Sequence, residues 1–146
     1  MSDVVHYRRI AEGEHLPNLQ HFAPFKAVLI LEDIYSAEWQ NEVSEWLIAN
    51  GCLYMMAWGD NCGSWDDSVD WANLERFNYG PIPDDQSVMT TWHDNTTLEE
   101  VFEFAQLWTF HPKAHLSSSV LIHISKDDRE DEMVRRFAAA NPVNDN

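Results

Sequence analysis

Four short apolar runs, separated by amphipathic stretches, limit the folds open to this chain more than any other feature of its sequence. The runs cover residues 27–31, 52–58, 87–93 and 119–124. Apolar side chains follow one another in these runs instead of alternating with polar ones, which is typical of strands buried on both faces of a parallel sheet. The chain therefore carries four candidates for interior strands.

The stretches that follow the runs have the signals of capped helices. A Ser, Thr or Asp side chain at a helix start can accept a hydrogen bond from a backbone N–H of the first turn, and a Glu three residues later completes a capping box. The candidate caps are Ser36, Ser64, Thr97 with Glu100, and Asp127 with Glu130. Strands and helices therefore alternate from the first run to the last helix.

This alternation predicts an α/β fold, a three-layer sandwich around a mostly parallel four-stranded sheet. Among the topologies that right-handed crossovers allow, we expect the strand order 2-1-3-4, a truncated flavodoxin-like sheet. A chain of 146 residues is long enough for one domain. We expect residues 24–140 to form that domain, after an N-terminal arm at 1–23 with a short strand at 4–7, and before a frayed tail at 141–146.

The charge of the chain limits the partners it can bind. Acidic side chains outnumber basic ones by 25 to 9, and Arg76 is the only basic residue between positions 27 and 112. A surface this negative repels nucleic-acid phosphates and anionic lipids, so we expect no direct binding to either. A basic protein, an amine or a metal ion would be attracted instead. A simpler interpretation is that the charge only keeps the protein soluble.

The sequence also bears on the compartment. The apolar runs are too short to span a membrane, and the first 20 residues lack the apolar core of a secretory signal. The two cysteines, Cys52 and Cys62, are then expected to be reduced thiols. We therefore expect a cytoplasmic protein.

A ligand site is expected beyond the carboxyl ends of the strands, where an open α/β sheet has its switch point. For the order 2-1-3-4 this point lies between the runs 27–31 and 87–93. The topology would then gather carboxylates and indole rings on one rim, a surface suited to Lys and Arg side chains through charge and cation–π contact. The predicted binding residues are Glu32, Asp33, Trp58, Asp60, Trp65, Asp66, Trp92 and Asp94.

The same edge carries candidates for catalysis and metal binding. His93 and Cys62 could act as base and nucleophile. Asp60, Asp67, His93 and Asp94 could bind a divalent metal ion through oxygen and nitrogen ligands. Ordinary structural roles remain open for these residues: a carboxylate at a helix start stabilises the helix dipole, and a His at a strand end is often a hydrogen-bonded core residue.

No cofactor motif accompanies these candidates. The sequence lacks GxGxxG, GxxxxGK[ST] and GxSxG, and the first run is followed by Glu-Asp-Ile-Tyr instead of a phosphate-binding loop. We therefore expect neither a flavin nor a dinucleotide. A divalent metal ion is the one cofactor left open.

Several short sequence segments resemble those of an uncharacterised bacterial family, a domain of unknown function. They are Gly-Cys-Leu-Tyr-Met-Met-Ala-Trp-Gly at 51–59, Cys62 with Trp-Asp-Asp-Ser-Val-Asp at 65–70, Ile-Pro-Asp-Asp at 82–85, and Met-Thr-Thr-Trp-His at 89–93. The similarity covers about residues 25–140. It implies a small, single-domain bacterial protein and no particular chemistry.

Three hypotheses of function follow from the sequence. The first is a non-catalytic cytoplasmic protein that engages a basic protein partner through the acidic, Trp-bearing rim, in the manner of an immunity protein, an antitoxin or a regulatory module. The alternative is a small hydrolase or lyase that depends on a divalent metal held by the Asp/His cluster. The third is a homodimer built on an exposed sheet edge or helix face.

Overall fold

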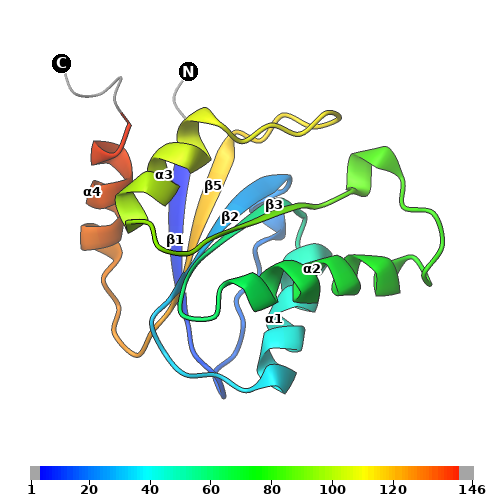
Figure 1. The fold of residues 1–146 in the computed structure, drawn as a ribbon, viewed down its shortest axis with the longest axis horizontal. Helices are drawn as coiled ribbons and strands as arrows, with labels where there is room; N and C mark the ends of the chain where they lie inside the picture. The colour runs from blue at the N-terminus through cyan, green and yellow to red at the C-terminus, as the bar shows by residue number, and fades with distance from the viewer. Residues whose placement is uncertain (1–3, 142–146) are drawn as a thin grey trace.

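A five-stranded parallel sheet forms the centre of the computed structural model, which describes residues 4–141 (Figure 1). The spatial order is β1-β5-β2-β3-β4, and every neighbouring pair is parallel. The strands are β1 (Val4–Ile10), β2 (Phe25–Leu31), β3 (Cys52–Gly59), β4 (Met89–His93) and β5 (Ser118–Ile124). The three most apolar strands, β2, β3 and β5, therefore occupy the interior of the sheet.

Two helices cover each face of this sheet. The helices are α1 (Ala37–Ala49), α2 (Gly63–Arg76), α3 (Leu98–Leu107) and α4 (Glu130–Ala139). Side chains of α1 and α2 share one core cluster with one face of the strands, and side chains of α3 and α4 share a second cluster with the other face. The arrangement is thus a helix–sheet–helix sandwich, with short 3₁₀ turns at Gln20–Phe22 and Asp84–Gln86. No helix within residues 4–141 has both the length and the apolar character needed to cross a membrane.

The predicted α/β class and mostly parallel sheet are confirmed, but the strand count of four and the order 2-1-3-4 are wrong. The run at 87–93 pairs with β3 and lies at the edge, and the last strand inserts between β1 and β2. All seven residues of β2 are buried, and so are six of the seven in β5, whereas β4 has none. The strands with the most apolar residues to bury, β5 among them, therefore lie inside the sheet, and β4 lies at its edge. The resulting order is not that of a truncated flavodoxin-like sheet.

The N-terminal arm is more regular than its sequence suggested. A full strand, β1, replaces the short strand predicted at 4–7, and it pairs with β5 along its whole length. Residues 1–3 of the predicted arm and 142–146 of the predicted tail lie outside the described residues.

Two of the four predicted helix caps are confirmed. Ser36 Oγ accepts from Trp39 N at 3.2 Å, and Thr97 Oγ1 accepts from Glu100 N at 3.2 Å. The predicted cap at Ser64 is wrong because Cys62, two residues earlier, holds the N-cap position of α2. The predicted cap at Asp127 is also wrong, since Arg129 holds the N-cap position of α4.

Candidate functional site

The chain leaves β2 and β5 in opposite directions, and this divergence defines the switch point of the sheet. β2 leads to α1 on one face, while its neighbour β5 leads to α4 on the other. Open α/β sheets bind ligands beyond the carboxyl ends of two such strands. The switch point predicted between 27–31 and 87–93 is therefore wrong, because β3 separates those two strands.

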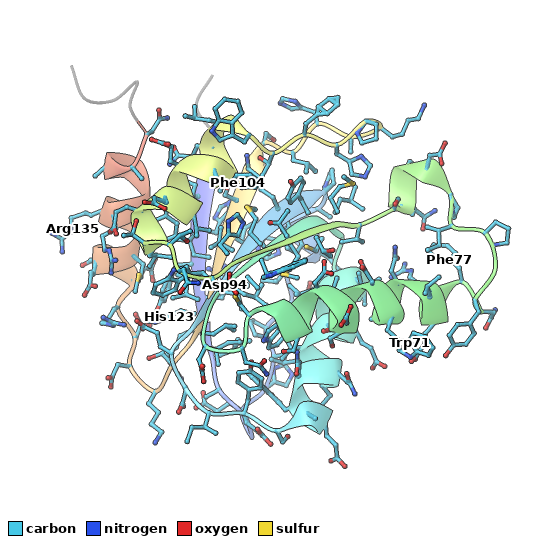
Figure 2. The ribbon with its side chains drawn as sticks, viewed as in Figure 1. Trp71, Phe77, Asp94, Phe104, His123 and Arg135 are labelled. Carbon is cyan, nitrogen blue, oxygen red and sulfur yellow. The ribbon has the colours of Figure 1, made fainter. Side chains whose placement is uncertain are left out.

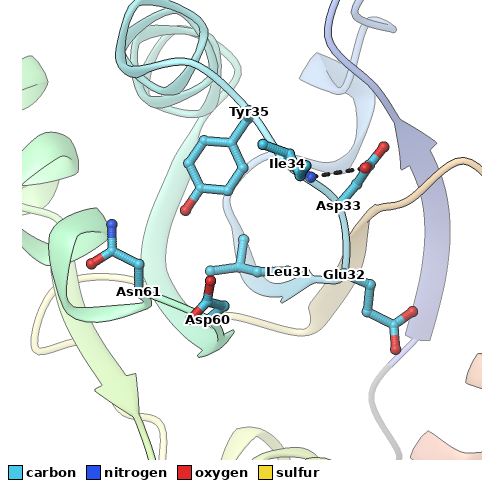
Figure 3. Close-up of a pocket in the computed structure, with 7 residues that line it drawn as sticks. All are labelled: Leu31, Glu32, Asp33, Ile34, Tyr35, Asp60 and Asn61. Carbon is cyan, nitrogen blue, oxygen red and sulfur yellow. Dashed lines mark hydrogen bonds between the residues drawn. The ribbon is translucent and has the colours of Figure 1, made fainter.

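A cleft of about 390 Å³ lies at this edge of the sheet, beyond the ends of β2 and β3 (Figure 3). Its lining residues include three carboxylates and no Lys or Arg; they are Leu31, Glu32, Asp33, Ile34, Tyr35, Asp60 and Asn61. Figure 3 shows Glu32 and Asp60 on opposite sides of Leu31, with the Tyr35 hydroxyl directed toward the end of β3. The negative charge is thus spread along the cleft instead of gathered at one point.

The loop after β2 is shaped by local hydrogen bonds. Asp33 Oδ1 accepts from Ile34 N at 2.8 Å, and this turn leaves the Ile34 side chain 90 % exposed. Tyr35 Oη accepts from Trp65 Nε1 at 2.8 Å, and the two rings pack edge to face at 5.4 Å. Because its oxygen accepts this bond, the Tyr35 O–H is left to donate elsewhere. The cleft thus presents an aliphatic side chain and a phenol beside its carboxylates.

Glu32 joins the cleft to a buried hydrogen-bond network. His123, which has no exposed surface, places Nε2 2.5 Å from Glu32 Oε1 and Nδ1 2.5 Å from Tyr7 Oη. Arg129 donates through Nη2 to the same Glu32 oxygen, and its backbone N donates to Tyr7 Oη at 3.1 Å. Strands β1, β5 and β2 and the start of α4 are thereby joined at the switch point.

The hydrogen bonds of this network fit one arrangement of its protons. Tyr7 Oη accepts from Arg129 N, so its own proton is free to be donated to His123 Nδ1. With Nδ1 accepting, a neutral imidazole carries its proton on Nε2 and donates it to Glu32. In this tautomer each ring nitrogen of His123 has a partner, with Nδ1 accepting from Tyr7 and Nε2 donating to Glu32 Oε1.

The same contacts determine the charge state of Glu32. Burial, the largest single effect, would raise the pKa of this carboxyl, but the hydrogen bonds from His123 and Arg129 and the Arg129 charge outweigh it and hold the pKa below its ordinary value of 4.5. Burial raises the pKa of the Tyr7 phenol. Glu32 is therefore an anion at neutral pH, and Tyr7 is a neutral donor.

Of the predicted binding residues, the structure gathers Glu32, Asp33 and Asp60 at the cleft. Trp65 is fully buried in the core, and only its N–H reaches toward the site, through Tyr35. The prediction that Trp65 contributes an indole ring to the binding surface is therefore wrong, because the packing of α2 on the sheet encloses this ring. The cleft aromatic is Tyr35.

The other predicted binding residues lie away from the cleft lining. Trp58 donates through Nε1 to Thr96 O at 2.9 Å. Asp66 accepts a hydrogen bond from Thr90 of β4. Trp92, on the edge strand, is half exposed, and Asp94 is exposed just after β4 (Figure 2). These four residues lie in or near the edge strand β4 and do not line the cleft.

The predicted catalytic pair, Cys62 and His93, is not brought together. Cys62 is buried in the core cluster beneath α1 and α2. His93 lies on the face covered by α3, 4.8 Å from the Phe104 ring, and burial lowers its pKa. Because alternate side chains of a pleated strand point to opposite faces, β4 directs His93 to the α3 face, whereas Cys62, at the N-cap position of α2, lies on the other face.

The four predicted metal ligands are also dispersed. His93 lies on the α3 face of the sheet, whereas Asp67 lies on α2, which covers the other face. Asp60 is in the cleft, and Asp94 follows the edge strand. Within residues 4–141, no three His, Cys, Asp or Glu side chains are grouped so that they could hold a metal ion. The predicted convergence of Asp60, Asp67, His93 and Asp94 is therefore wrong.

Sequence reasoning did not identify His123, Tyr7, Arg129 or Tyr35 as members of a site. One signal was available, because His123 is an imidazole inside a continuous apolar run, and a buried imidazole needs hydrogen-bond partners. Its partners lie 116 and 91 residues away in the sequence. Only the true strand order brings them into contact.

The fold and the cleft define a class: a small protein with a doubly wound, parallel α/β sheet and an acidic cleft beyond the carboxyl ends of β2 and β3. The chain belongs to the family described as "Domain of unknown function (DUF7684)", whose model matches residues 5–140. This confirms the predicted resemblance to a family without an assigned activity. Neither the curated proteins nor the solved structures contain a match to the chain.

Proposed function

We propose that this protein binds a basic protein partner, whose Lys or Arg side chains enter the cleft formed by residues 31–35, 60 and 61. The observation that carries the proposal is the lining of the cleft, which has three carboxylates and no basic side chain. A cationic group entering it gains charge attraction without displacing a lysine or arginine that lines the cleft. A small acidic inhibitor or regulatory module would act in this way.

The distribution of the carboxylates favours a protein over a metal ion. A divalent cation needs several oxygen ligands at one point, whereas Glu32 and Asp60 lie on opposite sides of Leu31 (Figure 3). Separated carboxylates suit an extended partner that carries more than one basic side chain. The exposed Ile34 and the Tyr35 ring add apolar and cation–π contact, which are typical of protein interfaces.

Glu32 is a fixed part of this surface. Its described contacts, with His123 and Arg129, use Oε1 alone, so Oε2 is available to a ligand. The buried His123 restricts the rotamers of the carboxylate, and a side chain already held in place loses less entropy on binding. The proposal includes a cytoplasmic location, which the unpaired Cys52 and Cys62 support.

The test uses a nonapeptide of arginine as the probe, with a nonapeptide of glutamate as the control, titrated into ¹⁵N-labelled protein at 50 and 300 mM NaCl. We expect amide shifts centred on residues 31–35 and 60–61 with the basic peptide, and weaker binding at the higher salt concentration. No shift with the acidic peptide is expected.

A matched pair of variants separates the cleft from the general charge of the protein. Asp33→Asn with Asp60→Asn should weaken binding about five- to tenfold, since exposed ion pairs contribute about 0.2–1 kcal/mol each. Glu42→Gln with Glu45→Gln, on the exposed side of α1, changes the net charge equally and should alter the affinity less than twofold. Equal weakening by both pairs, or shifts away from the cleft, would contradict the proposal.

A further inference from the structure

Two donors converge on a single oxygen of Glu32. His123 Nε2 lies 2.5 Å from Glu32 Oε1, and Arg129 donates to the same atom through Nη2. A carboxylate oxygen has two lone pairs, so these two bonds fill the hydrogen-bonding capacity of Oε1. No hydrogen bond from the described residues reaches Oε2, and this second oxygen is therefore open to a ligand of the cleft.

Arg129 is held at this position by contacts on both sides. Its Nη1 lies 3.3 Å from Glu132 Oε2, so the guanidinium bridges the carboxylate that follows β2 and a carboxylate of α4. The backbone N of Arg129 donates to Tyr7 Oη at 3.1 Å, which fixes the base of the side chain. Arg129 therefore occupies the place on Glu32 that the guanidinium of a partner would otherwise take.

Lysine and arginine differ in what they require of a carboxylate. A guanidinium is a planar fork, and its strongest contact places two N–H groups on the two oxygens of one carboxylate. An ammonium is a compact charge that can bind a single oxygen. Because Glu32 offers one open oxygen, it can accept an ammonium but not the fork of a guanidinium.

Asp60, on the opposite side of Leu31, offers a different contact (Figure 3). Within residues 4–141 no hydrogen bond or ion pair engages its carboxylate, so both oxygens are open to a guanidinium. An arginine peptide can therefore still bind in the cleft. The difference between the two carboxylates makes Glu32 the position at which lysine and arginine are distinguished.

We propose that Arg129 makes Glu32 selective for lysine, so that the partner side chain bound at Glu32 Oε2 is an ammonium. This inference rests on the proposed binding of a basic partner in the cleft. It adds the identity of one partner side chain and names the residue of this chain that selects it. Arg129 keeps its contact with Glu32 Oε1 in the complex.

The test compares nonapeptides of lysine and of arginine, each titrated into ¹⁵N-labelled wild type, Arg129→Met and Arg136→Met. Methionine has a similar length and no N–H donor. Arg136 is a matched control, because its side chain is 33 % exposed against 35 % for Arg129, it also contacts Glu132, and its loss changes the net charge equally. Circular dichroism checks that both variants fold.

In Arg129→Met, Glu32 Oε1 regains an open lone pair and the carboxylate can receive a fork. We expect the affinity for the arginine peptide to rise about threefold, the size of one exposed ion pair. The lysine peptide gains only from the loss of a nearby positive charge and should bind less than about twofold more tightly. An unchanged ratio of the two affinities, or the same change of ratio in Arg136→Met, overturns the proposal.

A double variant locates the gain. When Glu32→Gln is added to Arg129→Met, the fork no longer has a carboxylate at this position, and the ratio of arginine to lysine affinity should return to about the wild-type value. A ratio that stays raised without the Glu32 carboxylate would show that Arg129 acts only through its general charge, and would overturn the proposal.

The Arg129 side chain gives a readout in the wild type. Its guanidinium signals, assigned by their loss in Arg129→Met, should persist when the lysine peptide saturates the cleft, since the ammonium uses Oε2. Displacement of these signals to those of a free arginine side chain would overturn the proposal. Absence of cleft shifts with both peptides would contradict the proposed function itself, whereas cleft shifts without the expected selectivity would overturn this inference alone.

Discussion

His123 Nε2 lies 2.5 Å from Glu32 Oε1, and this contact joins a fully buried imidazole in β5 to a carboxylate that lines the cleft. The core and the candidate site therefore share one hydrogen-bond chain, which continues from His123 to Tyr7. A substitution in the core at this position should alter both the stability of the fold and the position of the Glu32 side chain.

Removal of the imidazole should destabilise the protein. His123→Leu fills the space but leaves the Tyr7 hydroxyl without its acceptor and removes one of the two described donors to Glu32, and we expect the free energy of unfolding to fall by about 2–3 kcal/mol. Tyr7→Phe should lower it by about 1 kcal/mol. Urea titrations followed by Trp fluorescence measure both. His15→Leu, at an exposed position, is the control, and an equal loss in the control would contradict the prediction.

The low pKa of Glu32 predicts a specific acid dependence. Because hydrogen bonds from His123 and Arg129 stabilise the carboxylate, the folded-state pKa lies below the ordinary 4.5 and the unfolded chain binds more protons just below that pH. The contribution of Glu32 to stability is thus complete above about pH 4.5 and is lost as the pH falls through the folded-state pKa. The difference in unfolding free energy between wild type and Glu32→Gln, measured from pH 7 to pH 3, should shrink below pH 4.5. A constant difference would show that ionised Glu32 contributes nothing.

The carboxyl of Asp70 affects the pH dependence of stability in the opposite direction to Glu32. Burial, then the charges of Asp66 and Asp67, raise its pKa above 3.8, while a hydrogen bond from Thr90 opposes the rise. The folded state then binds more protons than the unfolded chain between 3.8 and the raised pKa, so stability falls as the pH rises through that window. Asp70→Asn should raise the Tm at pH 7 by about 1–2 °C, and by nothing at pH 3. Asp85→Asn, at an exposed position in the turn before β4, controls for the change in net charge.

The layer architecture of this protein could be predicted from local sequence patterns, whereas its strand order could not. The runs at 27–31, 52–58 and 119–124 lie within β2, β3 and β5, and Ser36 and Thr97 cap helices as predicted. Strand order depends on which strands bury most surface together, a property of the whole sheet. β1, with its partly polar and charged sequence, gave only a weak local signal, although it completes the sheet beside β5.

The candidate site divides in the same way. Glu32, Asp33 and Asp60 could be predicted because each follows the carboxyl end of a strand, whatever the strand order. His123 and Tyr7 could not be placed there, since their contacts depend on β5 lying between β1 and β2. His93 was misplaced for the same reason, because β4 lies at the edge of the sheet and directs this side chain toward α3.

Gly59 connects the strand register to the shape of the cleft. It pairs with Leu31 across β2 and β3, has a φ of +118°, and is followed by Asp60 of the cleft. A Cβ at this position would lie 2.6 Å from Leu31 O, a backbone atom that cannot move without separating the two strands. Gly59→Ala should therefore lower the free energy of unfolding by about 2–3 kcal/mol, from backbone strain and the clash together.

Gly63→Ala is the matched control for this change. Gly63 begins α2, and a Cβ there would meet the Trp92 ring at 3.6 Å, an ordinary contact, so the variant should be neutral or gain up to about 1 kcal/mol. Chemical denaturation measures both variants, and the arginine nonapeptide then reports on the cleft. Because Leu31 and Asp60 both line the cleft, Gly59→Ala should also weaken peptide binding under conditions where it remains folded. A destabilised Gly59→Ala that binds the peptide with wild-type affinity would show that the cleft tolerates displacement of the ends of β2 and β3, and that the position of Asp60 does not determine binding.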